Sequence, residues 1–158
     1  MVHAYYSEGV EERTGAPAAE QFEHGADVGI RGRGATVGEA FSGAALALSS
    51  LWASDPASVR PESEAGVACA AADLESLLVA FLDELIYLFA TRRFLFCRLD
   101  VRIEGAPGAP VRLAARGAGE RFDPRRHEST VEPKGATFTA LRVARDDGGW
   151  VAECVVDV

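Results

Sequence analysis

The sequence predicts an α+β domain in which two helices pack on one face of a mainly antiparallel sheet. Apolar residues recur at helical spacing in two stretches, one after Thr36 and one after Asp73. Elsewhere, apolar and polar residues mostly alternate in short runs separated by turn sequences, which is typical of strands with one buried face. Antiparallel strands with helices gathered on one face define this fold class.

The composition predicts one globular domain. The chain has 158 residues, of which 48% are apolar and 25% are charged. Residues 1–19 lack sustained periodicity, so we expect a flexible arm there and a single domain over residues 20–158. The formal net charge of −8 argues against nucleic acid as a direct partner, because phosphate binding needs a basic surface. A basic protein or a cation is the expected partner.

The cysteines and the hydropathy predict a cytoplasmic protein. Cys69, Cys97 and Cys154 are widely spaced and form no C-x-x-C pair, so we expect reduced core residues. No signal peptide precedes the domain and no apolar run reaches transmembrane length, so we expect no membrane association.

The first half of the domain begins with two predicted strands, over residues 20–24 and 27–33. Thr36 and Glu39 then have the spacing of a capping box, in which each side chain bonds a backbone N–H at the start of a helix. The helix that follows is rich in alanine and ends before Pro56.

The middle of the chain contains the longest predicted helix. Residues 67–71 form either a strand, which we favour, or the approach to that helix, for which Asp73 is the N-cap. From residue 94 to 103 the hydrophobic period changes to two, which predicts a long strand. A turn and a partner strand over residues 111–115 complete a hairpin.

The last part of the chain is expected to contain a loop and two strands. Residues 117–130, with Pro124, predict an exposed polar loop. Residues 131–145 alternate in character and predict one strand. Residues 146–149 are rich in Asp and Gly and predict a hairpin turn before the final strand, over residues 150–158.

Acidic groups occur at both ends of the predicted domain. Asp27 opens an early strand, and Asp157 lies in a final run of valines, one residue before the free carboxylate of Val158. A carboxylate in an apolar strand is costly unless it is paired. If the two strand ends meet, three negative groups converge, and Ca²⁺ and Mg²⁺ prefer such oxygen ligands. A hydrated strand end is the alternative.

Two other arrangements carry charge. His24 and Asp27 have the residue types of a catalytic pair or a transition-metal site, but no motif supplies a nucleophile, and a structural histidine is the simpler interpretation. The segment 119–134 concentrates positive charge and is either a docking surface, a phosphate contact or a solvated loop. Its basic residues are Arg121, Arg125, Arg126, His127 and Lys134.

Six separated stretches of this sequence resemble the archease family. They are residues 22–30, 36–45, 83–89, 122–128, 132–138 and 155–158, in the order that the family has them. Three positions depart from the family pattern: Gly25, Gly135 and Thr139 replace the more usual threonine, alanine and histidine.

The resemblance implies an archease-like fold and an activator or chaperone of an RtcB-type RNA ligase in tRNA splicing or RNA repair. Such proteins promote guanylylation and multiple turnover of the ligase and are not enzymes themselves. The family's metal site corresponds to Asp27, Asp157 and Val158, its functional lysine to Lys134, and His24 belongs to the same signature. We expect a divalent metal, Ca²⁺ first, with Mg²⁺, Mn²⁺ or Zn²⁺ as alternatives. A stand-alone metal-dependent hydrolase and a calcium-stabilised binding module are the competing hypotheses.

Overall fold

The computed structural model describes residues 18–158. Its elements, in chain order, are β1 (Ala18–His24), β2 (Asp27–Gly34), α1 (Val37–Trp52), the 3₁₀ helix η1 (Pro56–Ser58), β3 (Ser63–Ala71), α2 (Leu74–Arg92), β4 (Phe94–Glu104), β5 (Val111–Arg121), β6 (Gly135–Ala136), β7 (Arg142–Asp146) and β8 (Gly149–Asp157). The flexible arm expected over residues 1–19 lies outside the described residues, except that Ala18 and Ala19 begin β1.

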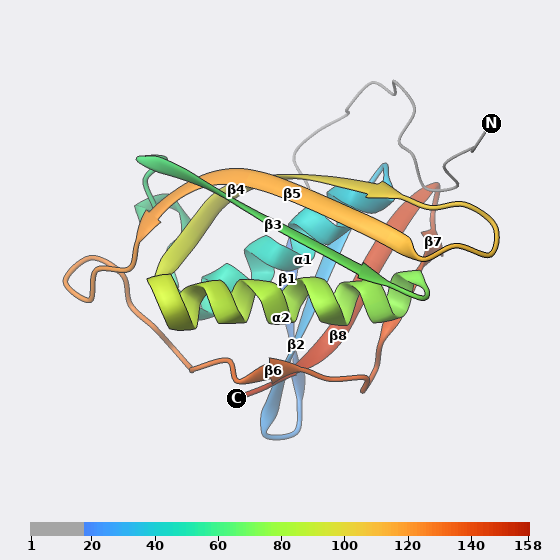
Figure 1. Cartoon of the computed structure of the whole chain (residues 1–158). Coiled ribbons are helices and arrows are strands. Elements are labelled where there is room, and N and C mark those ends of the chain that lie inside the picture. Colours follow the sequence, from blue (N-terminus) through green and yellow to red (C-terminus); the bar gives the residue numbers. More distant parts are fainter. Residues whose placement is uncertain (1–17) are drawn as a thin grey trace.

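Within residues 18–158 the strands form two antiparallel sheets, and α1 and α2 lie between them (Figure 1). One sheet has the order β1-β2-β8-β6, with β7 also paired to β8, and the other has the order β3-β5-β4. Each helix contacts strands of both sheets. The α+β class, the two helices and the antiparallel pairing are confirmed, with the strands divided between two sheets where one was expected.

Helix α1 is buried on nearly all sides. It fits between the two sheets because many of its side chains are small. Its predicted capping box is present: the Glu39 N–H donates to Thr36 Oγ1 at 3.1 Å, and the Thr36 N–H donates to Glu39 Oε2 at 3.3 Å. The helix backbone lies directly against β2 at Gly32, where a Cβ would overlap the Ala40 carbonyl oxygen and the Ala44 nitrogen. Glycine is therefore required at this crossing.

Helix α2 covers the core between β3 and β6. Asp73 is its N-cap and accepts the Ser76 N–H at 2.8 Å, as the sequence predicts. The helix ends at Arg92, because the next residue, the C-cap Arg93, has a left-handed φ of 53° that stops further helical hydrogen bonding. Phe81 packs against Phe41 of α1, with ring centroids 6.0 Å apart, which links the two helices at the centre of the core.

Strand β5 is longer than the sequence predicts. Residues 117–130 were expected to form an exposed loop, but the strand continues to Arg121, and both Glu120 and His127 are buried. The two side chains bond each other, with His127 Nε2 3.1 Å from Glu120 Oε2. Buried polar groups are tolerated when they are paired in this way.

The strand predicted over residues 131–145 is divided in the structure. β6 contains only Gly135 and Ala136, and the chain then turns before β7, with Ala140 at a φ of 51°. A residue in the left-handed region cannot continue a strand, so alternation of polar and apolar residues was misleading here. The predicted turn between β7 and β8 and the strand over residues 67–71 are confirmed.

The close contact between β2 and α1 gives a stability prediction. Gly32→Ala will lower the free energy of unfolding by about 3 kcal/mol, because the added methyl group forces the strand and helix backbones apart. Urea denaturation measures the change. Gly135→Ala is the matched control, since its Cβ would meet only Asp83 Oδ1, at an ordinary 3.8 Å. Equal stability of the two variants would contradict the packing described.

Candidate functional site

The pairing of β2 with β8 brings the two ends of the domain together. Val28 pairs with Val156, and the antiparallel register, continued by one residue, sets Asp27 opposite Asp157. Directly opposed residues point their side chains to the same face, with Cβ atoms about 5 Å apart. The Val158 N–H also lies 3.5 Å from Asp27 Oδ1. The structure therefore brings Asp27 to the end of β8, beside the backbone of Val158.

His24 lies beside Asp27 because the two residues flank a two-residue hairpin turn. They are cross-strand partners at the end of the β1–β2 pairing, and the His24 side chain is exposed. Gly25 occupies the first central position of this turn with a φ of 60°, a conformation that glycine adopts without strain. The departure from the family pattern at this position therefore suits the local backbone.

Lys134 is held next to Asp157 by the main chain. Its N–H donates to the Asp157 carbonyl oxygen at 2.7 Å, and the following residue, Gly135, pairs with Asp157 in the β6–β8 ladder. The Lys134 side chain is exposed. The candidate residues thus occupy adjacent strands at the end of the sheet where the C-terminus lies (Figure 1).

The candidate metal ligands at this end of the sheet are carboxylates. In residues 18–158, no group of three or more His, Cys, Asp and Glu side chains is placed to hold a metal. A three-ligand site therefore needs the terminal carboxylate of Val158 in addition to Asp27 and Asp157. Such an all-oxygen set fits Ca²⁺ or Mg²⁺ better than Zn²⁺, which favours nitrogen and sulfur ligands.

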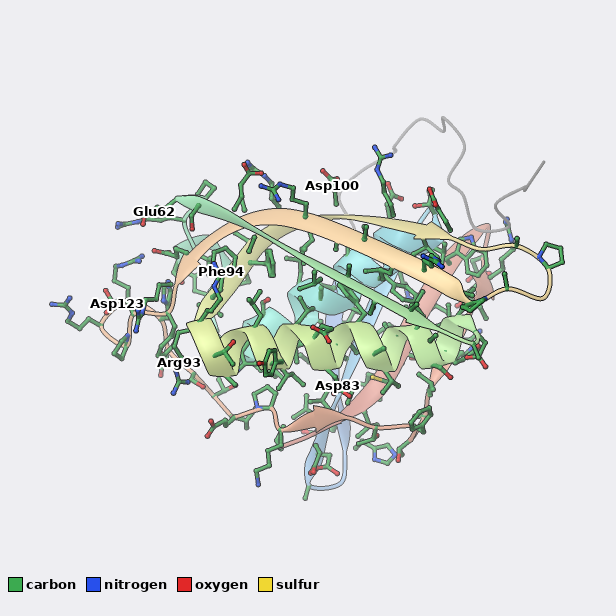
Figure 2. The ribbon with its side chains drawn as sticks, viewed as in Figure 1. Glu62, Asp83, Arg93, Phe94, Asp100 and Asp123 are labelled. Atoms are coloured by element: carbon green, nitrogen blue, oxygen red, sulfur yellow. The ribbon has the colours of Figure 1, made fainter. Side chains whose placement is uncertain are left out.

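Asp83 of α2 is a residue near this end that the site prediction did not include. Its Oδ1 accepts the Ala136 N–H at 2.8 Å, so the carboxylate binds the backbone of β6 from the helix above it (Figure 2). Asp83 lies within one of the stretches that resemble the family, but helical periodicity alone gives only a solvent-facing acid. Its contact with β6 depends on how the chain packs.

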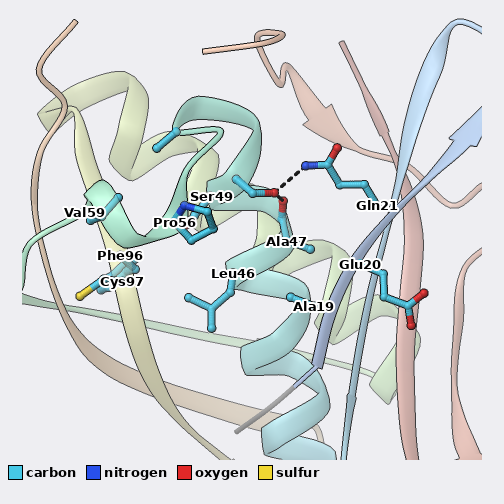
Figure 3. A pocket seen from close by; sticks show the side chains of 12 residues that line it. Ala19, Glu20, Gln21, Leu46, Ala47, Ser49, Pro56, Val59, Phe96 and Cys97 are labelled. Carbon is cyan, nitrogen blue, oxygen red and sulfur yellow. Dashed lines mark hydrogen bonds between the residues drawn. The ribbon is translucent and has the colours of Figure 1, made fainter. Parts of the chain in front are cut away.

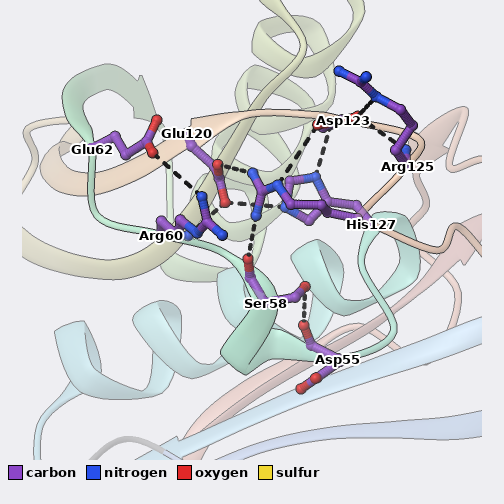
Figure 4. A network of polar contacts seen from close by, with 9 residues as sticks. Asp55, Ser58, Arg60, Glu62, Glu120, Asp123, Arg125 and His127 are labelled. Atoms are coloured by element: carbon purple, nitrogen blue, oxygen red, sulfur yellow. Dashed lines mark hydrogen bonds and ion pairs between the residues drawn. The ribbon is translucent and has the colours of Figure 1, made fainter.

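The segment that follows β5 is fixed by a buried polar network (Figure 4). Glu120 accepts hydrogen bonds from the Arg60 N–H at 2.6 Å and from the Arg126 guanidinium. The Asp123 N–H donates to His127 Nδ1 at 2.8 Å, so the ring proton is on Nε2, which faces Glu120 Oε2. The network ties residues 122–127 to the core.

This network changes the interpretation of the basic segment. Burial disfavours ionisation of Glu120, but hydrogen bonds from Arg126, the Arg60 N–H and His127 outweigh it and hold the pKa of Glu120 below its ordinary value. Arg126 and His127 therefore have a structural role here and are not exposed docking groups. Arg121 and Arg125 remain exposed.

A separate cavity of about 390 Å³ lies between β1, α1, η1 and β4 (Figure 3). The lining of the cavity is largely apolar. At one side of the cavity, Gln21 donates a hydrogen bond to Ser50 Oγ at 2.6 Å. None of the predicted site residues lines it. The cavity therefore gives no support to a substrate pocket at the carboxylates.

The three cysteines are free, and two of them have raised pKa values. Burial, with a smaller effect of the Asp83 charge, raises the pKa of Cys154 to about 12. Burial and the Glu84 charge raise the pKa of Cys69 to about 11. Both thiols are protonated at neutral pH and are poor nucleophiles, so they do not supply the nucleophile of a hydrolase.

Comparison with known proteins identifies the family. Residues 20–158 match the model of the archease protein family (MTH1598/TM1083). The chain belongs to the archease family. It is 39% identical to the protein archease of Pyrococcus furiosus over 140 residues, which are 88% of this chain and 97% of that protein. It is 36% identical to the protein archease of Methanosarcina mazei over 139 residues, 88% of this chain and 94% of that protein.

Solved archease-family structures share the fold. The solution structure of Methanobacterium thermoautotrophicum protein 1598 superposes with a TM-score of 0.76 at 30% identity, covering 89% of this chain and 99% of that one. A Thermotoga maritima crystal structure, described as an archease and possible chaperone, gives a TM-score of 0.52 at 17% identity, with 88% and 96% covered. That identity supports the fold alone. In residues 18–158 of this archease, no helix has the length and apolar character of a membrane span.

The buried network predicts an acid-dependent stability. Because the folded-state pKa of Glu120 lies below its ordinary value of 4.5, its stabilising contribution is complete above that value and is lost as the pH falls through the folded-state pKa. Glu120→Gln will cost about 2 kcal/mol at neutral pH, by weakening charged hydrogen bonds. Its melting temperature will also fall less steeply than that of the wild type below about pH 5.

Glu128→Gln is the control for that measurement, since Glu128 is exposed in the same segment. Thermal melts of the three proteins at a series of pH values provide the comparison. Parallel pH profiles for Glu120→Gln and the wild type would contradict the role given to Glu120.

Proposed function

We propose that this archease activates an RtcB-type RNA ligase, promoting its guanylylation and multiple turnover through a divalent metal held by Asp27, Asp157 and the Val158 carboxylate. The observation that carries this proposal is the pairing of β2 with β8, which aligns the two aspartates and brings the Val158 N–H to 3.5 Å from Asp27 Oδ1. Membership of the archease family supports the choice of an RNA ligase as the partner.

The electrostatics of the strand ends support a cation at this place. Like charges on directly opposed residues of a sheet destabilise it, and the terminal carboxylate adds a third negative group beside them. A divalent cation between these groups removes the repulsion, and carboxylate oxygens are its preferred ligands. The metal would supply positive charge at the contact with the ligase, and the three groups of this chain would hold it there.

The arrangement favours an accessory protein over an enzyme. His24 and Asp27 are neighbours, but His24 is exposed at a hairpin end, and the cavity lies elsewhere. The possible-chaperone description of the Thermotoga maritima relative agrees with a protein partner. Lys134, exposed and fixed through its backbone beside Asp157, is suited to contact an anionic group of the ligase or its nucleotide.

The central test uses the ligase encoded in the same genome, GTP and Mn²⁺, and follows the covalent GMP adduct over multiple turnovers. Asp27→Asn will reduce the multiple-turnover rate at least about tenfold, because an amide is a weaker ligand for a hard cation. Asp147→Asn, an exposed residue of the β7–β8 turn, is the matched control and will behave as the wild type. Full stimulation by folded Asp27→Asn would end the proposal.

Two cheaper measurements separate the competing functions. Ca²⁺ will raise the melting temperature of the wild type but not of Asp27→Asn, because a ligand that binds only the folded state stabilises it. If this shift occurs without any effect on the ligase, the protein is a calcium-stabilised binding module. Hydrolysis of phosphate esters by the isolated protein, lost in Asp27→Asn, would instead indicate a metal-dependent hydrolase.

Lys134 gives a prediction that is independent of the metal. Lys134→Met keeps much of the side-chain length and removes the charge, so stimulation of the ligase will fall at least about tenfold while the Ca²⁺-induced rise in melting temperature persists. Arg142→Met, on the exposed part of β7, controls for loss of a surface charge. Loss of the Ca²⁺ effect in Lys134→Met would show that the lysine acts on the metal site.

A further inference from the structure

Two large apolar side chains are strongly exposed in residues 18–158, and one of them follows Lys134 closely. Phe138, between β6 and β7, is 68% exposed, and Tyr87, on the outer face of α2, is 66% exposed. An isolated exposed aromatic side chain is common on protein surfaces and by itself indicates nothing. Phe138 differs in the way its backbone is held and in its position.

The backbone on both sides of Phe138 is fixed to β8. The Thr137 N–H donates to the Val155 carbonyl oxygen at 3.0 Å, and the Val155 N–H donates to the Thr139 carbonyl oxygen at 3.1 Å. The Thr139 N–H also donates to Thr137 Oγ1 at 3.2 Å. Phe138 is therefore presented to solvent from a defined backbone, so little conformational entropy of that backbone remains to be lost on binding.

The same segment is anchored on its other side and reaches the candidate site. Asp83 Oδ1 binds the Ala136 N–H at 2.8 Å, and the Lys134 N–H binds the Asp157 carbonyl oxygen at 2.7 Å. Val155, which holds the residues around Phe138, precedes Asp157 by two residues, a rise of about 7 Å along the strand. An exposed aromatic side chain, a lysine and the carboxylates therefore share one end of the sheet.

We propose that Phe138 is the apolar anchor of the surface through which this archease docks on its ligase, with the ligase providing an apolar pocket bordered by basic side chains. This inference rests on the proposed function and names the contact that accompanies the metal site.

The chemistry of the partner surface follows from the aromatic side chain of Phe138 and from the net charge of the protein. Aromatic side chains are enriched at the centres of protein interfaces, where they fill pockets of the partner. The formal net charge of −8 favours basic groups around that pocket. The polar surroundings of Phe138 would then form the rim of the interface.

The test measures affinity for the ligase by titration calorimetry, without added RNA. Phe138→Ala will weaken binding about thirty-fold, the loss typical of an interface anchor. Phe138→Tyr, which retains the ring, will bind within a few-fold of the wild type. Tyr87→Ala is the matched control, because Tyr87 is equally exposed on a different element, and it will not change the affinity.

The melting temperature and its Ca²⁺-induced rise will be unchanged in Phe138→Ala, because the Phe138 side chain is exposed and makes none of the hydrogen bonds that hold Thr137 and Thr139 to β8. Unchanged affinity of Phe138→Ala, or an equal loss in Tyr87→Ala, would overturn the inference and leave the proposed function standing. Failure of the wild type to bind the ligase would contradict the proposed function itself. Self-association of the wild type that Phe138→Ala abolishes would assign the anchor to a second copy and overturn the inference.

Discussion

The antiparallel pairing of β2 with β8 determines most of what is distinctive in this protein. It joins a strand from the beginning of the domain to the last strand of the chain, at the centre of the five-stranded sheet. The register is fixed because Ile30 and Cys154, which pair with each other, are completely buried on the face that α1 covers. A shift of one residue would expose them. The same register aligns Asp27 with Asp157, so burial on one face positions the acids at the strand ends.

β6 lies beside β8 and is held there by contacts with the rest of the fold. β6 is only two residues long and has few ladder bonds of its own, so its position depends on contacts with other elements. Asp83 bonds it from α2, and the preceding segment is tied to the core where Glu120, Arg126 and His127 form their network. Lys134 is thus connected to the core on both sides, although it lies in a segment with little regular structure.

The family assignment and the proposed mechanism rest on different observations. The family follows from the match over residues 20–158 and from relatives at 36 to 39% identity. The proposed metal site rests on the acidic groups at the ends of β2 and β8, with Lys134 beside Asp157, whereas the proposed ligase partner rests on the family. These groups lie at one end of the sheet and suit the accessory role proposed for this archease.

Local patterns in the sequence determined the α+β class, both helix N-caps and most strands, because periodicity and capping depend on near neighbours along the chain. They also identified Asp27, Asp157 and Val158 as acidic groups. Only the tertiary structure decided that β2 pairs with β8, which brings Asp27 beside Val158, that β5 continues to Arg121, and that the strands separate into two sheets. The roles of Glu120 and Asp83 were also decided there. Each carboxylate accepts a hydrogen bond from a residue distant in the sequence, Glu120 from Arg60 and Asp83 from Ala136. Patterns among neighbouring residues cannot predict such contacts.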